Sequence, residues 1–384
     1  MSTQTTALLQ KNNRIGRWFL CFCFLLLSIF PVYRNFYYSN GMLTYERHKA
    51  VIEKKSEFYN PWQYRILCPY TVEALVKLYS ITVDKIYPVE QKIHFSIESN
   101  TGTTNETNQF VKLMQTRGAM KYMVVFIFFR FTEHFFIFFL AWRLWGYFVK
   151  SEWLIFLGIN FLALAIGNSV AVADLSFNTY MDIIFYLTTA NIIVYKKNHL
   201  WLLPITVLAS FNRETGILIP ALYFISQTEF LQFKPNQTFW KSFIFPPTKI
   251  WWLTIFLYVL FFAVFIGLRV YFGYKPQQVF KVPAGVAMLK LNLFSVIAVK
   301  GYMELLGTFA VIPLIILYTF KRLPYLLKKW FLFIVPIWFP IHFVAVVAYQ
   351  TRTFLVPLAM IMIPMFLWLI ENEIKNNIEK PTNI

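Results

Sequence analysis

The stretch IWWLTIFLYVLFFAVFIGLRVY, residues 250–271, decides the fold class of this chain. One α-helix of roughly 20 apolar residues crosses the hydrocarbon core of a bilayer, so this stretch predicts a membrane span. Similar apolar runs recur along nearly the whole chain, without the short alternating segments of a transmembrane barrel. Only 14% of the 384 residues are charged, against about 25% in soluble domains. The sequence therefore predicts an all-α, polytopic transmembrane helical bundle.

Apolar length predicts a single transmembrane domain, 1–384, of about eight to ten membrane segments. Residues 200–227 are interpreted as a hairpin of two short helices broken near Asn212-Arg213-Glu214. Only the hairpin keeps the basic links Lys196-Lys197 and Lys321–Lys329 on one side of the membrane, which is then the cytoplasmic side. Both termini lie there, including a tail at 372–384. The spans are predicted at residues 18–33, 121–142, 153–172, 178–195, 250–271, 303–320, 330–349 and 353–371.

A long segment, residues 34–120, follows the first span and is predicted to face outward. Structureless links above roughly 15 residues are uncommon in compact folds, so this outer loop should contain helices of its own. Tyr64 to Leu78 has the spacing of an amphipathic helix whose apolar face would lie on the membrane interface. Residues 96–109 are polar and lack apolar periodicity, which predicts a mobile tip.

The formal net charge of +18 does not indicate a nucleic-acid-binding protein. Lysine and arginine gather in the short links between apolar runs, which is typical of cytoplasmic loops rather than of a phosphate-binding face. Three cysteines are too few for a disulfide framework. The composition, rich in Phe, Lys and Asn, suits a protein of a bacterial inner membrane, and we expect no nucleic acid among its partners.

Polar clusters interrupt the apolar runs at four places. Ionisable groups at membrane depth are costly, so they usually pair, line a water-filled cavity or do chemistry. With the predicted topology all of the clusters meet at the outer face of the membrane. They are Trp62-Gln63-Tyr64-Arg65, Asp174 to Asp182, Asn212-Arg213-Glu214-Thr215 and Gln350-Thr351-Arg352.

Three short motifs carry a resemblance to a known superfamily. They are Gln63-Tyr64-Arg65-Ile66-Leu67-Cys68-Pro69, Phe211-Asn212-Arg213-Glu214-Thr215 and Thr351-Arg352-Thr353-Phe354-Leu355-Val356-Pro357. Together with the large outer loop after the first helix, they resemble the multi-pass membrane glycosyltransferases of the GT-C fold, in particular bacterial members. The resemblance implies transfer of a sugar from a polyprenyl-phosphate donor in the membrane lipid to a glycan or lipid acceptor at the outer membrane face.

The resemblance also implies a catalytic carboxylate early in the outer loop, where Glu46 is the nearest candidate. Asp174 and Glu214 are further candidate acids or bases, because a base must take the proton of the acceptor hydroxyl. A divalent cation is the cofactor that these carboxylates would suit, although no compact metal motif supports it. Arginine can bind two phosphate oxygens at once. The candidate substrate- and phosphate-binding residues are Arg65, Arg213, Arg352, Asn212, Gln63 and Tyr64.

Each candidate also has a purely structural interpretation. Arg213 and Glu214 could pair at a hydrated helix break, and Arg65 could anchor an interface helix. Asp174 could cap a helix. The intramembrane residues Arg130, Glu133 and His134 are interpreted as a polar lock between helices rather than as a proton relay.

Other functions stay open at the sequence level. A secondary transporter would also contain a broken helix, but it should show a second, matching break in an internal repeat, and the sequence has no copy of Asn212-Arg213-Glu214. A polysaccharide polymerase or a non-catalytic scaffold of an envelope complex would carry similar charges. Polymerases usually have their largest outer loop late in the chain, which favours the transferase.

Overall fold

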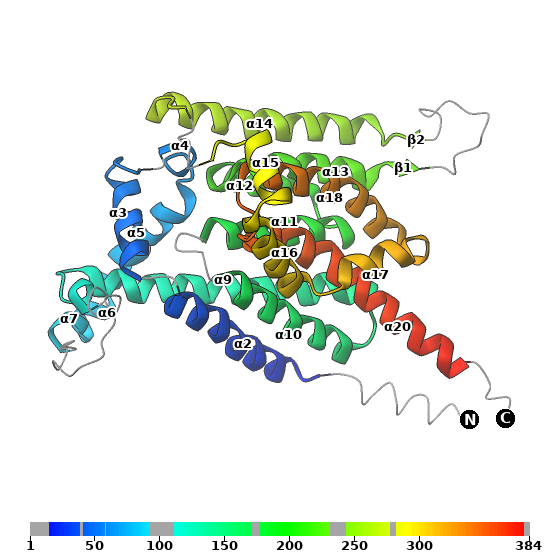
Figure 1. The fold of residues 1–384 in the computed structure, drawn as a ribbon, viewed down its shortest axis with the longest axis horizontal. Coiled ribbons are helices and arrows are strands. Elements are labelled where there is room, and N and C mark those ends of the chain that lie inside the picture. Colours follow the sequence, from blue (N-terminus) through cyan, green and yellow to red (C-terminus); the bar gives the residue numbers. More distant parts are fainter. Residues whose placement is uncertain are drawn as a thin grey trace.

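The computed structural model describes residues 15–38, 41–57, 59–92, 111–170, 177–230, 243–276 and 282–379 of the chain. The described part is a bundle of long helices with a cluster of short helices at one end (Figure 1). The predicted mobile tip at 96–109 lies outside the described residues. Two-residue strands, β1 (Glu229–Phe230) and β2 (Phe243–Ile244), form an antiparallel pair.

Six segments are long and apolar enough to cross a membrane, or up to seven if one bent helix pair counts as a span. This agrees with the predicted helical class with several candidate membrane spans, but the number is lower than the eight to ten segments predicted from apolar length. The helices among them are α2 (Arg17–Tyr38), α9 (Ala119–Phe148), α10 (Glu152–Ser169), α14 (Thr248–Phe272), α18 (Tyr325–Ala345) and, with the short turns before it, α20 (Ile363–Glu379).

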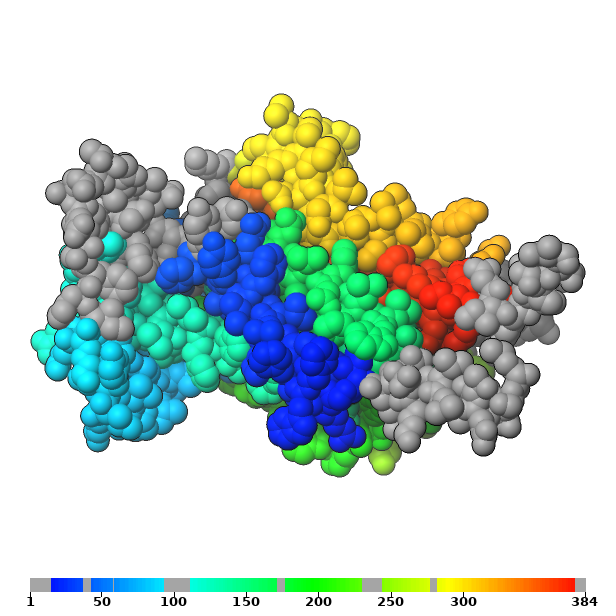
Figure 2. Space-filling view, turned by 90° about the horizontal axis from the view of Figure 1, so that it is seen from below, coloured from blue at the N-terminus to red at the C-terminus, as the bar shows by residue number. Residues whose placement is uncertain are grey.

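Helix α11 (Phe177–Val194) forms the centre of the bundle, because nearly all of its side chains are buried. It packs against α9, α12 (Leu202–Asn212) and α13 (Leu218–Gln227). By contrast, α2 lies across the outside, as Figure 2 shows. Its outward side chains, such as Trp18 and Phe22, are exposed, which suits a helix face in contact with lipid.

The first-loop helices lie at the end of the bundle opposite to the start of α2 and the end of α20 (Figure 1). The apolar face of α5 packs on α9: Val72 is fully buried in a small core with Cys68, Tyr122 and Phe126. The prediction that this face lies on the membrane interface is therefore wrong for Val72, since the helix covers α9 instead. These helices are α3 (Gly41–Ile52), α4 (Tyr59–Trp62), α5 (Leu67–Ile81), α6 (Val83–Ile86) and α7 (Val89–Lys92).

Two predicted spans are divided in the structure. The chain between the predicted spans 250–271 and 303–320 is partly helical, as α15 (Val286–Phe294) and the start of α16 (Val296–Phe309), which meet at an angle of 73°. Ser295 makes this bend, because its hydroxyl accepts hydrogen bonds from the amides of Ile297 and Ala298 and so starts a new helix. The predicted span 303–320 is interrupted at Ala310, whose positive φ of 50° separates α16 from α17 (Ile312–Thr319).

The predicted span 353–371 begins with irregular turns. A 3₁₀ turn at Thr351–Phe354 is followed by α19 (Leu355–Pro357), a π-helical turn at Leu358–Met362 and α20. Pro364 has no N–H to donate to the Met360 carbonyl, which is the bond that a continuous α-helix would require. The segment is nevertheless the most deeply buried candidate span.

Candidate functional site

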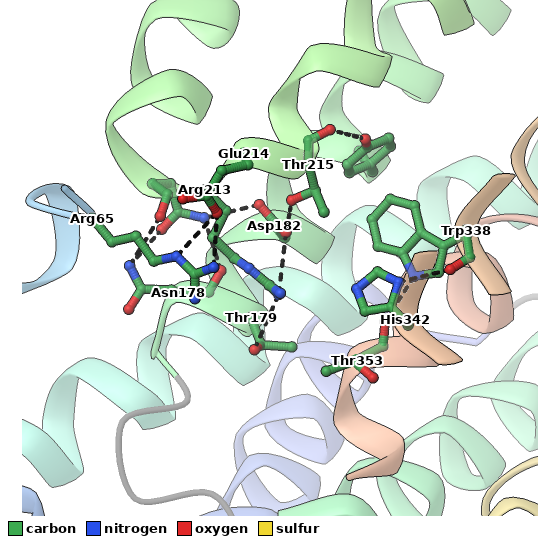
Figure 3. A network of polar contacts seen from close by, with 12 residues as sticks. Arg65, Asn178, Thr179, Asp182, Arg213, Glu214, Thr215, Trp338, His342 and Thr353 are labelled. Carbon is green, nitrogen blue, oxygen red and sulfur yellow. Dashed lines mark hydrogen bonds and ion pairs between the residues drawn. The ribbon is translucent and has the colours of Figure 1, made fainter. Parts of the chain in front are cut away.

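The site is built around the break between α12 and α13. Helix α12 ends at Asn212, Arg213 is extended (φ −157°, ψ 157°), and a 3₁₀ turn at Glu214–Ile217 leads into α13. Gly216 allows this close return, because a Cβ atom there would lie only 3.0 Å from the Ala209 Cβ. Asn212, Arg213 and Thr215 thereby face Asp182 on the buried helix α11, whereas Glu214 faces Arg65 (Figure 3).

Asp182 on α11 is the inner partner of the break. Its carboxylate is 1% exposed and accepts hydrogen bonds from Asn212 Nδ2 at 2.9 Å and Thr215 Oγ1 at 2.5 Å. Arg213 Nη1 lies 3.4 Å from the second carboxylate oxygen. Both oxygens are therefore satisfied, and the buried charges of Asp182 and Arg213 balance each other.

Neutral side chains extend this inner network to α5 and to the start of α11. Asn178 Nδ2 donates to the backbone carbonyl and to the side-chain oxygen of Asn212, each at 3.2 Å. The Cys68 thiol donates to the same side-chain oxygen at 3.4 Å. Burial raises the pKa of this thiol well above its ordinary value, so the proton stays on the sulfur. Arg213 Nη1 also donates to Thr179 Oγ1 at 3.3 Å.

Glu214 is the outer, partly open member of the site. Arg65, just before α5, donates to Glu214 Oε2 from Nε at 3.2 Å and from Nη2 at 2.7 Å. Arg269 near the end of α14 approaches Oε1 at 3.7 Å. The Glu214 side chain is 35% exposed, whereas those of Arg65 and Arg269 are 14% and 17% exposed. A carboxylate between two arginines thus marks where the network reaches solvent.

Two predicted binding residues connect the outer loop to its surroundings. The Tyr64 hydroxyl donates to the Gly273 carbonyl at 2.9 Å and accepts from the Lys275 amide at 3.1 Å, and the ring lies under the Arg269 guanidinium. Gln63 Nε2 donates to the Val51 carbonyl at 3.1 Å. Tyr64 therefore positions Arg269, while Gln63 holds α3 beside α5.

The other candidates are Glu46, Asp174 and Arg352. Glu46 is exposed on α3, and Asp174 lies outside the described residues. Arg352 donates to Gln350 at 3.2 Å, and no ion pair links it to Glu214 or Asp182 within the described ranges. The expected meeting of the Arg352 cluster with Asp174 falls outside the described residues.

An aromatic wall separates the break from the turn that carries Arg352. Tyr186 on α11 donates to the Thr215 carbonyl at 2.6 Å and packs edge-on against Trp338 of α18. The Trp338 indole donates to the Thr353 carbonyl at 2.7 Å, and the His342 ring stacks on it (Figure 3). These rings therefore connect the helix break at Thr215 to the turn at Thr353.

Sequence reasoning missed Arg269 and did not single out Asn178 or Thr179. Arg269 is the only charged residue in the apolar stretch 250–271. A single charge in such a stretch indicates a functional or paired residue, so this pattern could have identified it. The trio Arg130, Glu133 and His134 is buried in α9 near the site. Arg130 stacks on the Phe177 ring and His134 packs edge-on against Tyr180, both on α11, so these residues contact the neighbouring helix.

Comparison with known proteins yields no match to a family model, to a curated protein or to a solved structure. The fold and the site therefore define a class: a helical protein with several candidate membrane spans and a charged cluster at a helix break. Within the described residues no group of three His, Cys, Asp or Glu side chains could hold a metal ion. The Asp182 oxygens already accept from Asn212 and Thr215, so they do not suit a divalent cation.

Proposed function

We propose that this protein is a membrane glycosyltransferase that moves a sugar from a polyprenyl-phosphate donor to a glycan or lipid acceptor at the outer membrane face. The observation that carries the proposal is Glu214, partly open to solvent between Arg65 and Arg269. It lies at a broken helix and directly follows Arg213, which pairs with the buried Asp182. Non-helical backbone at membrane depth is tolerated where it lines a cavity in the protein, and such breaks often bind polar substrates.

The charge of the cluster supports an anionic ligand. Three arginines, Arg65, Arg213 and Arg269, stand against two carboxylates, which leaves one positive charge in a largely buried place. A phosphate group would compensate that charge, and arginine binds phosphate oxygens in a two-point geometry. In sugar transfer the same guanidinium groups would stabilise the charge that grows on the leaving phosphate.

The distribution of basic residues supports the proposed side of action. The link between α17 and α18 carries Lys321, Arg322 and Lys328, and it lies at the end of the bundle where α2 starts and α20 ends (Figure 1). Basic links are typical of the cytoplasmic side, so we place both termini in the cytoplasm. The cluster lies toward the opposite end, next to the first-loop helices, as a bacterial inner-membrane enzyme acting outward requires.

Sugar transfer by the purified protein in nanodiscs tests this function, with a panel of radiolabelled polyprenyl-phosphate sugars as donors. We expect labelled product from the unchanged protein and a loss of about 10²-fold or more in Arg65→Ala and Arg269→Ala, because each removes a donor to the leaving phosphate. Arg322→Ala is the matched control, since Arg322 forms an exposed ion pair with Glu373 far from the cluster. No transfer from any donor, together with saturable solute uptake into proteoliposomes, would establish a transporter instead.

A further inference from the structure

Helix α3 carries a buried histidine, His48, that the sequence did not single out. Its side chain is 2% exposed and packs against the rings of Tyr122 and Phe126 on α9. Glu46, the predicted base, is two residues away on the same helix and exposed. At 3.6 residues per turn, two positions differ by about 200°, so His48 and Glu46 occupy opposite faces of α3. His48 is therefore the residue of this pair that faces the protein interior.

A carboxylate from α5 orients the imidazole. His48 Nε2 lies 2.9 Å from Glu73 Oε1, and Tyr122 donates its hydroxyl to both Glu73 oxygens at 2.9 and 3.0 Å. Because an ionised carboxylate only accepts hydrogen bonds, this arrangement places the ring proton on Nε2. Nδ1 then keeps its lone pair, and it has no hydrogen-bond partner among the described residues. An imidazole held by a carboxylate at one nitrogen is the usual arrangement of a general base.

The same imidazole reaches the candidate site. A small pocket between α3, α5 and α11 is lined by His48, Trp62, Arg65, Cys68 and Asn178, among others. Arg65 binds Glu214, and Asn178 binds Asn212, so this pocket adjoins both layers of the charged network. His48 and Arg65 are therefore both part of the lining of this one pocket.

We propose that His48 is the general base of the sugar transfer and that Glu73 is its positioning residue. This inference rests on the proposed function. His48 Nδ1 takes the proton of the acceptor hydroxyl, and the acceptor oxygen forms a bond to the anomeric carbon of the donor sugar. The bond from that carbon to the phosphate oxygen breaks, and the phosphate leaves with the electron pair beside Arg65. The imidazolium formed at His48 is stabilised by the Glu73 carboxylate.

Charged groups on α3 and α5 act on His48. Glu73 from α5 favours the imidazolium, whereas Lys49 on α3 disfavours it, and a raised pKa keeps the Tyr45 hydroxyl neutral at ordinary pH. The Tyr122 hydroxyl also keeps its proton, since it donates to Glu73. Burial lowers the pKa of His48 below its ordinary value, so the imidazole is neutral and able to accept a proton at neutral pH.

The test compares the pH dependence of transfer in variants reconstituted in nanodiscs. His48→Gln keeps an N–H for Glu73 but removes the basic nitrogen, so kcat should fall about 10²- to 10⁴-fold. The donor KM should stay unchanged, and the acidic limb of the kcat profile should disappear. Glu73→Gln should reduce kcat less and move the acidic limb to lower pH, because the imidazolium loses its carboxylate. His199→Gln is the matched control, since His199 bonds to the Tyr223 hydroxyl at the other end of α12.

The outcomes separate this inference from the proposed function. If the unchanged protein transfers no sugar, the transferase proposal fails and the role of His48 falls with it. If the unchanged protein is active and His48→Gln keeps its kcat and its acidic limb, His48 is not the base although the function stands. Should His48→Gln fail to fold, Glu73→Gln decides the matter: an acidic limb that does not move would overturn the proposal.

Discussion

Arg213 is a buried cation whose charge is balanced mainly by the equally buried Asp182. Replacing one partner of a buried pair leaves an uncompensated charge, which typically costs about 3–5 kcal/mol. Asp182→Asn keeps the shape of the side chain, so we expect the free energy of unfolding to fall by about that amount. Glu373→Gln makes the same change in an exposed pair and should cost under about 1 kcal/mol. Equal shifts in the two unfolding midpoints would contradict the proposed role of the inner pair.

His48 gives stability a specific pH dependence. Burial lowers its pKa below the ordinary value of 6.5, so the folded protein binds this proton less readily than the unfolded chain. The contribution of neutral His48 is then complete above about pH 6.5 and is lost as the pH falls below that value. We expect Tm to decrease between about pH 6.5 and 5, and to decrease less in His48→Gln. Parallel Tm profiles of the two proteins would exclude this assignment.

The sequence predicted the residue types of the site better than their pairing. Asn212, Arg213 and Glu214 stood out as polar residues in an apolar run, and they do meet Arg65 and Asp182. Their partners lie 30 or more positions away along the chain, so pairing depends on how helices pack rather than on local pattern. The sequence did not indicate a role for His48 for the same reason, because the packing of α3 on α5 places Glu73 beside it.

At the scale of elements, the turn between α12 and α13 depends on a glycine without a side chain. A Cβ at Gly216 would lie 3.0 Å from the Ala209 Cβ and 3.1 Å from its carbonyl carbon. Overpacking of this kind costs about 1–3 kcal/mol, so Gly216→Ala should lower Tm and reduce the rate of the proposed sugar transfer. Gly267→Ala on α14 is the control, because nothing lies within 4 Å of the added atom. It should be neutral or slightly stabilising, since alanine favours helix more than glycine does.

Apolar length predicted where helices occur but not where they break. The divided segments are set by single residues: the Ser295 cap, the positive φ of Ala310 and the missing N–H of Pro364. None of these lowers hydropathy enough to end an apolar run. We expect Ser295→Ala to cost about 1 kcal/mol through the lost cap. Thermal unfolding is compared with that of Ser226→Ala, which removes another partly buried serine hydroxyl, one that accepts from the Trp330 indole, and shows whether the loss is specific to the bend.

At the scale of the whole molecule, the helix at the buried centre of the bundle also carries part of the candidate site. Helix α11, nearly all of whose side chains are buried, supplies Asn178, Thr179 and Asp182. The partly open cluster around Glu214 lies where this helix, the helix break and the first loop meet. The packed interior therefore holds the charged groups in place, and the outermost carboxylate, Glu214, is the most exposed of them. Such preorganisation is what charge stabilisation in a low-dielectric site requires.

The proposed orientation in the membrane can be tested by labelling cysteines from one side. If the first-loop helices face outward, a cysteine at the exposed position Lys85 on α6 should react with a membrane-impermeant maleimide in intact cells. Cysteines at the exposed positions Lys197 and Lys321 should react only after the cells are opened, because basic links stay in the cytoplasm. The native Cys21, Cys23 and Cys68 are replaced by serine or alanine in the parent, which must remain unlabelled. Labelling of Lys197→Cys from outside, with Lys85→Cys protected, would show that the orientation in the membrane is the reverse of the proposed one. The Arg65–Glu214 cluster would then lie on the cytoplasmic side. An outward-acting transferase would then be excluded, whatever chemistry the cluster supports.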